Sequence, residues 1–445
     1  MKAYWPDSNR LKQILVLSLP IMAGMLSQSV LNLVDTWMVA HLGSAALAAV
    51  GMASNTNYLA SAAVIGLGAG VQAMVARRKG EANHNEMALP LNAGLTIAII
   101  MALPLFMLFF FGAETIMGAL LPDAHVSGLA SEYFAIRIVG IFALGMNFSF
   151  RGYWNGVNRS MVYMRTLITM HVLNVVLSYG LIFGCFGLPE LGVYGAGLGT
   201  TLALYFASLL YAVQCWWLSR SHGFLRARPH WAQIRDTLKL ALPNSIQQVF
   251  FAGGITTLFW IIGQVSTDAL AIGHVLFSII LFLILPSMGL GMASTSLVSQ
   301  ALGRKDKEDA FLWGINISLV GMAFLWLMAL PLLLAPDAVL GLFVQDPELI
   351  ELGRGPLQIT AIFIGLDAAG IILSQALLGA GAAKTVMKIS ITLQWGFFIP
   401  MAYLIGPALG YGLLGIWIFQ LIQRFLQAII MLKQWRSRSW ATITI

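Results

Sequence analysis

Two carboxylates stand inside long apolar stretches of the sequence, where an ionised side chain is costly. Of the 18 Asp and Glu residues, Asp35 and Asp367 are the two that lie well inside such stretches. A charged carboxylate at the centre of a bilayer costs ~2.5–3.5 kcal/mol on insertion scales, so it must pair, face a cavity or take up a proton. Asp35 is therefore a candidate for proton or cation coupling, and Asp367 for a second cation site.

Asp35 lies on a polar stripe. Gln28, Asn32 and Asp35 are spaced i, i+4 and i+7, which places them on one face of a helix. Pro20 stands fifteen residues earlier, about 22 Å along an ideal helix, and removes a backbone hydrogen bond there. This pattern predicts a cavity lined by Gln28 and Asn32 and a helix that bends at Pro20 when Asp35 is protonated. The alternative is a structural Asp35 held by neighbouring amides.

Other polar residues in the apolar runs have two possible roles. His171, Asn174 and Ser178 follow i, i+3 and i+7, so they share a helix face. They either complete the coupling site or form interhelical hydrogen bonds worth about 0.6 kcal/mol each. Thr200 and Gln247 either line a cavity or bond within and between helices.

The composition excludes a soluble protein. Of the 445 residues, 59% are hydrophobic and only 10% are charged, whereas soluble domains carry about 25% charged residues. The sequence has no metal-ligand spacing, Walker loop or nucleophile elbow. We therefore expect a polytopic membrane protein without a metal or cofactor and without catalytic residues.

Twelve apolar runs are long enough to span a bilayer, which takes about 20 residues. Their continuous apolar character predicts helices rather than barrel strands. The runs are 14–39, 46–76, 89–113, 127–154, 161–187, 191–219, 234–264, 267–300, 311–334, 350–378, 385–409 and 411–434.

The basic residues set the orientation. With both termini in the cytoplasm, all but two of the 25 Lys and Arg residues fall on the cytoplasmic side, the exceptions being Arg137 and Arg354. This bias follows the positive-inside rule. It accounts for the net charge of +7 without a nucleic-acid partner.

The two halves of the chain repeat with an offset of 223 residues. LVLSLP (15–20) aligns with LKLALP (238–243), and GLG (66–68) aligns with GLG (289–291). Asp35 aligns with Leu258, so the two buried carboxylates are not equivalent in the repeat. GLGAG (66–70) and GAGLG (195–199) are typical of closely packed helices.

Each repeat holds six helices, so both copies start on the same membrane face and are related by an axis along the membrane normal. We expect an all-α protein with two six-helix lobes: an N-lobe (1–219), a cytoplasmic linker (220–239) and a C-lobe (240–445). Two such lobes around a central cavity are typical of alternating-access transporters.

LNLVDTWMVAHLGSAALAAVG (31–51) resembles the helix 1–2 signature of multidrug and toxic compound extrusion (MATE) transporters. Within that family the chain resembles the DinF-like branch, whose helix 1 proline and aspartate match Pro20 and Asp35, and whose helix 5 asparagine matches Asn174. The second aspartate of that branch is Ser178 here. Asp367 resembles the helix 10 aspartate of the NorM-like branch, but the matching helix 7 glutamate position is Phe251.

The resemblance implies an antiporter of the bacterial inner membrane that exports lipophilic or cationic organic compounds. We expect H⁺ to drive it through Asp35, with Na⁺ as the alternative ion. The expected partners are the small-molecule substrate and the lipid bilayer, and nothing in the sequence requires more than a monomer.

Two other functions compete with this one. A lipid-linked oligosaccharide flippase of the same superfamily is disfavoured because no Arg or Lys is placed deep within a predicted span, where it could meet a pyrophosphate. A membrane-embedded enzyme is disfavoured because Asp35 and Asp367 stand in different lobes without an adjacent histidine.

Overall fold

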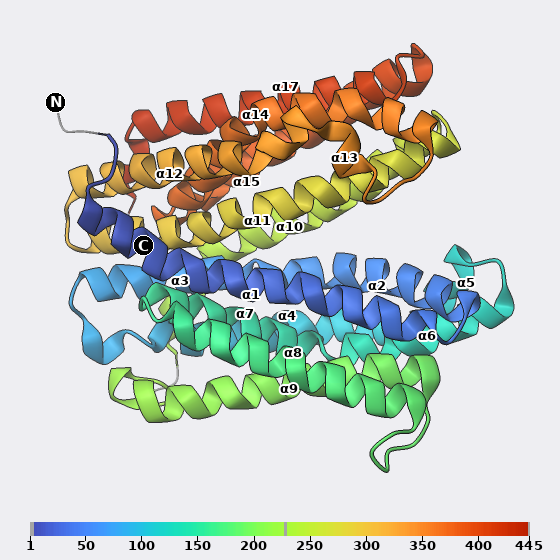
Figure 1. The fold of residues 1–445 in the computed structure, drawn as a ribbon. Helices are drawn as coiled ribbons and strands as arrows, with labels where there is room; N and C mark the ends of the chain where they lie inside the picture. Colours follow the sequence, from blue (N-terminus) through green and yellow to red (C-terminus); the bar gives the residue numbers. More distant parts are fainter. Residues whose placement is uncertain (1–3, 227–228, 444–445) are drawn as a thin grey trace. The chain divides into compact units, whose positions relative to one another are not determined.

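The computed structural model describes residues 4–226 and 229–443, and within these ranges every regular element is helical (Figure 1). The first half contains α1 (Ser8–Ala40), α2 (Ser44–Ile65), α3 (Leu67–Gly80), α4 (Leu89–Phe111), α5 (Ala113–Leu120), α6 (Ala124–Val139), α7 (Ile141–Gly156), α8 (Ser160–Phe183) and α9 (Gly192–Ser219). The second half contains α10 (Trp231–Gly263), α11 (Thr267–Gly303), α12 (Lys307–Leu334), α13 (Pro336–Leu340), α14 (Pro347–Gly379), α15 (Ala383–Ile391), α16 (Ile399–Tyr403) and α17 (Gly412–Arg436).

The helices account for twelve membrane spans. Among the described residues, eleven helices are long and apolar enough to cross a bilayer, with α2 and α3 counted together as Ser44–Gly80. The twelfth span is the pair α6 and α7, which bends by 44° and falls on the predicted run 127–154. Helices satisfy their own backbone groups, which lipid cannot do. The predicted all-α polytopic fold with twelve spans is confirmed.

The chain divides into two compact units. The N-unit comprises residues 23–249, and the C-unit comprises residues 1–22 and 250–445. α1 and α10 therefore each contribute residues to both units, and the division in α1 falls just after Pro20. The boundaries 1–219, 220–239 and 240–445 follow the sequence repeat rather than contacts, and they stay a prediction.

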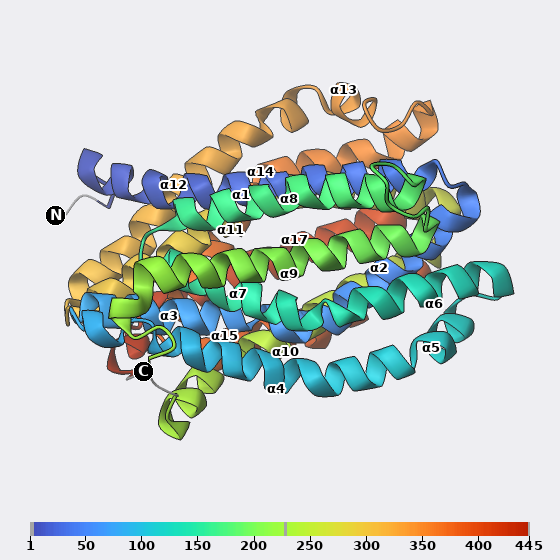
Figure 2. The ribbon, with the colours of Figure 1, turned by 90° about the horizontal axis from the view of Figure 1, so that it is seen from below.

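Small residues bring the N-unit helices close together, as the two glycine motifs predict. A Cβ atom added at Gly66 would lie 2.4 Å from Ser245 Oγ, and one added at Gly195 would lie 2.4 Å from the Leu181 carbonyl oxygen. α8 and α9 run side by side in both views (Figures 1 and 2). Without a hydrophobic force between helices in lipid, such close van der Waals contact is what holds them together.

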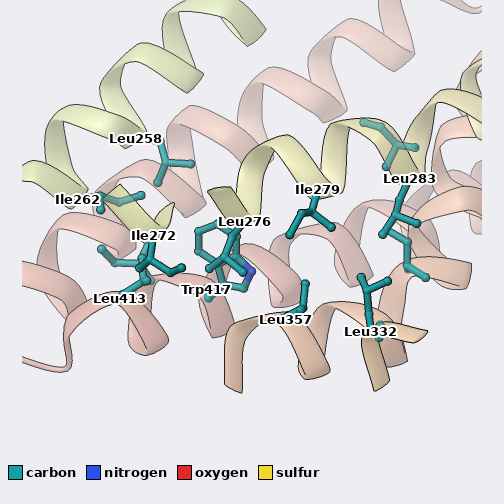
Figure 3. Close-up of a cluster of buried hydrophobic side chains, with 14 of the residues drawn as sticks. Leu258, Ile262, Ile272, Leu276, Ile279, Leu283, Leu332, Leu357, Leu413 and Trp417 are labelled. Atoms are coloured by element: carbon teal, nitrogen blue, oxygen red, sulfur yellow. The ribbon is translucent and has the colours of Figure 1, made fainter. Parts of the chain in front are cut away.

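A separate apolar cluster forms the core of the C-unit (Figure 3). Ile272, Leu276 and Ile279 follow a helical spacing along α11, so one face of that helix is buried. Trp417 of α17 is fully buried, and its indole donates to Thr360 Oγ1 over 3.0 Å, which satisfies the one polar atom of the ring.

Candidate functional site

A cavity of about 540 Å³ lies within the N-unit. Its walls come from α1, α2, α6, α7, α8 and α9. The volume falls within the range of about 300–1,000 Å³ that is usual for small-molecule sites.

The polar stripe of α1 faces this cavity. Gln28, Asn32 and Asp35 all line it, as the sequence predicts. The Gln28 amide donates to Asn32 Oδ1 over 3.1 Å, and the Thr36 hydroxyl donates to the Asn32 carbonyl over 2.8 Å. One carboxylate oxygen of Asp35, Oδ1, is buried and has no hydrogen-bond partner among the described residues. Asp35 is thus held at the cavity wall with an acceptor available for a proton or a ligand.

α8 contributes Asn174, and Ser178 holds it in place. Asn174 lines the cavity, whereas Ser178 is buried behind it and donates to Asn174 Oδ1 over 3.0 Å. Gly199 of α9 leaves room for this pair, because a Cβ atom there would lie 2.6 Å from Ser178 Oγ. The Asn174 Nδ2 atom is buried without a partner among the described residues, so it can donate to a ligand.

His171 joins α8 to the polar stripe of α1. Its Nδ1 lies 2.9 Å from Ser27 Oγ, and its Nε2 lies 3.1 Å from Gln28 Oε1. The Ser27 hydroxyl also donates to the Gly24 carbonyl over 2.7 Å. The ring therefore bridges two helices, and Gln28 links it to Asn32.

The remaining predicted residues divide between the cavity and other places. Thr200 lines the cavity and donates back to the Ala196 carbonyl over 3.0 Å. Gln247, on α10, does not line it, and Pro20 lies inside α1 in the part that belongs to the C-unit. α1 is one uninterrupted helix at Pro20, so bending on protonation stays a prediction.

Sequence reasoning missed the face that α2 presents to the cavity. Ser54, Asn57, Tyr58 and Ser61 line it. Their spacing of i, i+3, i+4 and i+7 is the same signal that identified the α1 stripe. Unlike the α1 stripe, this face contains no charged side chain.

Arg137 is a further cavity residue that sequence reasoning missed. It lies near the end of α6, just before the bend at Gly140, and it lines the cavity. The bend is stabilised by α9: the Thr201 hydroxyl donates to the Ile136 carbonyl over 3.0 Å, and the Tyr205 hydroxyl donates to the Val139 carbonyl over 2.8 Å. These donors satisfy backbone groups at the break in the helix, which lipid cannot do.

The location of Arg137 corrects two expectations. The residue does not lie outside the membrane, because α6 and α7 together form one bent span and Arg137 stands near its middle. The statement that no Arg or Lys lies deep within a span is therefore wrong. The apolar residues on both sides of Arg137 continue through the bend, and the cavity supplies the polar space that its charge needs.

A sequence model of the MatE family matches residues 20–180 and 243–404. The two matches cover most of the chain and begin 223 residues apart, which is the offset of the internal repeat. The chain belongs to the MatE family. MatE proteins are transporters, so this chain is a transporter and not an enzyme.

Relatives of this MatE protein match over nearly its whole length. A probable multidrug resistance protein NorM of Bradyrhizobium diazoefficiens is 28% identical over 436 residues, covering 95% of this chain and 92% of that protein. An uncharacterized transporter YisQ of Bacillus subtilis is 24% identical, covering 91% and 90%. The resemblance to the DinF-like branch stays a prediction.

Solved structures share the fold. A MOP superfamily transporter from Pyrococcus furiosus, described as having a binding pocket of reverse polarity, superposes with a TM-score of 0.88 at 23% identity. The match covers 98% of this chain and 97% of that one. The two-lobed, twelve-span fold of MatE transporters is therefore the fold of this chain.

The second intramembrane carboxylate of this MatE protein is paired. Asp367 of α14 lies 3.3 Å from the Arg424 guanidinium of α17, and both side chains are largely buried. The cavity beside them measures about 20 Å³, room for about one water. Arg424, expected at the cytoplasmic face, instead lies midway along α17, because Asp367 neutralises it there. A cation at Asp367 would have to displace this guanidinium.

No group of three His, Cys, Asp or Glu side chains in the described part of the chain is arranged to hold a metal ion. The candidate site is thus the N-unit cavity. Its charged lining, among the described residues, consists of Asp35 and Arg137.

Proposed function

We propose that this MatE protein is a multidrug efflux antiporter that exports lipophilic or cationic organic compounds in exchange for H⁺. The observation that carries the proposal is that the lining of the ligand-sized N-unit cavity contains one carboxylate among the described residues, that of Asp35. Relatives named as probable multidrug resistance proteins support multidrug efflux as the function.

The charge balance of the cavity explains how a proton and a cationic substrate compete. With Asp35 ionised, the formal charges of Asp35 and Arg137 cancel, and with Asp35 protonated the lining carries +1. At about 6 Å and an effective dielectric constant of about 20, the attraction between a cation and Asp35 is about 3 kcal/mol. Losing it lowers cation affinity about 100-fold. Proton entry therefore expels a cationic substrate.

The same helix that carries Asp35 is shared between the two units. Pro20 and the residues before it belong to the C-unit, whereas Asp35 belongs to the N-unit. A change in α1 at Pro20 would therefore displace residues that belong to both units. This supports Pro20 as the bend point of the transport cycle, with Asn174 and its support Ser178 completing the coupling site.

We place the protein in the bacterial inner membrane as a monomer, with both termini in the cytoplasm. The bias of Lys and Arg toward one face still holds after Arg137 and Arg424 are moved into spans. Na⁺ is the alternative coupling ion, and Asp367, paired with Arg424, is the weaker candidate for its site.

The test is dye efflux from proteoliposomes under separately imposed H⁺ and Na⁺ gradients, with tetramethylrhodamine methyl ester as a lipophilic cation. We expect the wild type to move the dye under a pH gradient alone and Asp35→Asn to lose that transport. Asp337→Asn is the matched control, because Asp337 is an exposed carboxylate paired with Arg354 outside the cavity and such pairs contribute little.

Two results would contradict the proposal. Transport that is driven only by Na⁺ and survives Asp35→Asn would move the coupling site away from α1. Equal losses in Asp35→Asn and Asp337→Asn would show that the assay reports charge removal in general.

A lipid-linked oligosaccharide flippase is the second candidate, and Arg137 now favours it. A guanidinium in the cavity could meet a pyrophosphate, although here Asp35 opposes its charge. Movement of a fluorescent lipid-linked pyrophosphate, with no dye transport under either gradient, would support the flippase.

A further inference from the structure

Asp35 and Arg137 place opposite formal charges in one cavity without neutralising each other directly. Both residues line the cavity. Among the described residues, however, no ion pair or hydrogen bond joins them, although the chain forms such pairs elsewhere, as between Asp367 and Arg424. The two charges therefore remain available to a third group.

The buried polar atoms of this pair lack partners. Asp35 Oδ1 and Arg137 Nε and Nη1 are all buried without a hydrogen bond to any described residue. Buried donors and acceptors are almost always satisfied in folded proteins, and an unsatisfied charged group is especially costly. The missing partners of Arg137 must come from water or from a bound ligand.

The chemistry of a guanidinium specifies what such a ligand carries. Its N–H groups form a planar fork that matches the two oxygens of a carboxylate. Asp35, in turn, accepts a cationic group. The rest of the lining includes Ile141, Leu144 and the ring of Phe148, which suit an apolar aromatic body between the two charges.

We propose that the cavity selects zwitterionic aromatic compounds, with Arg137 binding a carboxylate of the substrate and Asp35 its cationic group. This inference rests on the proposed function and narrows its substrate class. A substrate of this kind leaves no buried charge unpaired, whereas a simple cation leaves Arg137 without a partner.

The alternative is that Arg137 has only a structural role, bridged to Asp35 by water. Both roles predict that replacing Arg137 lowers either the stability of the protein or its affinity for the dyes. They differ in whether the effect depends on the carboxylate of the ligand.

A matched pair of dyes separates them: tetramethylrhodamine, a zwitterion with a free carboxylate, and its methyl ester, a cation with the same ring system. Equilibrium binding to the full chain in lipid nanodiscs is followed by fluorescence anisotropy, and the ratio of the two Kd values is compared between variants. The ratio cancels changes in the amount of folded protein.

We expect the wild type to bind the acid at least about tenfold more tightly than the ester, because a charge-assisted bidentate contact is lost in the ester. Arg137→Gln should abolish this preference while changing the affinity for the ester less than about threefold. Arg137→Lys, which keeps the charge but not the fork, should retain part of the preference.

Asp35→Asn and Arg354→Gln complete the design. Asp35→Asn should weaken the binding of both dyes, because both carry the cationic group. It should leave the preference for the acid over the ester intact. Arg354→Gln removes an exposed guanidinium outside the cavity and should leave both affinities unchanged.

Equal affinity of the wild type for acid and ester, a preference that persists in Arg137→Gln, or failure of both dyes to bind would overturn the inference. An equal loss of affinity for both dyes in Arg137→Gln would also overturn it and would assign Arg137 a structural role. The proposed function is judged separately by gradient-driven transport of the ester, so the two can fail independently.

Discussion

Replacing Gly199 by alanine tests whether the packing of α8 on α9 positions the polar wall of the cavity. A Cβ atom at Gly199 would lie 2.6 Å from Ser178 Oγ and 2.8 Å from Ser178 Cα and N, whereas ordinary contacts begin at 3.4 Å. The two helices would have to separate by about 0.6 Å, because the nearest atoms include backbone. Overpacking of this kind costs ~1–3 kcal/mol, and the separation would pull Ser178 away from Asn174.

The matched control is Gly128→Ala in α6, where an added Cβ atom meets nothing within 4 Å. In the interior of a helix this change alone should stabilise by ~0.5–1 kcal/mol. Thermal unfolding of the purified protein should therefore show a midpoint for Gly199→Ala that is lower than that of Gly128→Ala by at least about 2 °C. Dye affinity should fall only in Gly199→Ala. A midpoint for Gly199→Ala equal to or above the control, with unchanged dye affinity, would refute the reasoning.

Three further experiments test other parts of the structure. Combining Thr201→Val with Tyr205→Phe removes both side-chain donors to the carbonyls at the bend; we expect a loss of about 1–2 kcal/mol, seen as a lower unfolding midpoint, and weaker binding of the zwitterionic dye. Asp367→Asn leaves the Arg424 charge unpaired and should destabilise more than the double variant with Arg424→Gln, which a double-mutant cycle of midpoints measures. Leu276→Ala empties part of the C-unit core and should cost ~2–5 kcal/mol without changing dye affinity; an altered affinity would contradict the assignment of the site to the N-unit.

The sequence predicts the α1 wall of the cavity because polar residues at helical spacing lie on one face of a helix. Gln28, Asn32 and Asp35 had to share one side of a helix whatever that helix packs against. Asn174 and Thr200 also line the cavity. The twelve spans follow as directly, from the length of each apolar run and the thickness of a bilayer.

What the sequence could not supply was the partner of each buried charge. Arg137 stands inside a run that breaks at Gly140, and the hydroxyls that stabilise the break come from α9, more than 60 residues later. Asp367 meets Arg424 across 57 residues of sequence. Counting charges by membrane face assigns such residues to water, whereas tertiary contacts keep them inside.

Proton release on substrate binding tests the central claim that substrate and proton compete for Asp35. Purified protein in weakly buffered solution is titrated with the rhodamine ester over a series of pH values, and released H⁺ is followed with a pH electrode. We predict that the wild type releases protons as the dye binds, that Asp337→Asn releases as many, and that Asp35→Asn releases none while still binding the dye at higher concentration. Equal proton release by Asp35→Asn and the wild type would contradict the account.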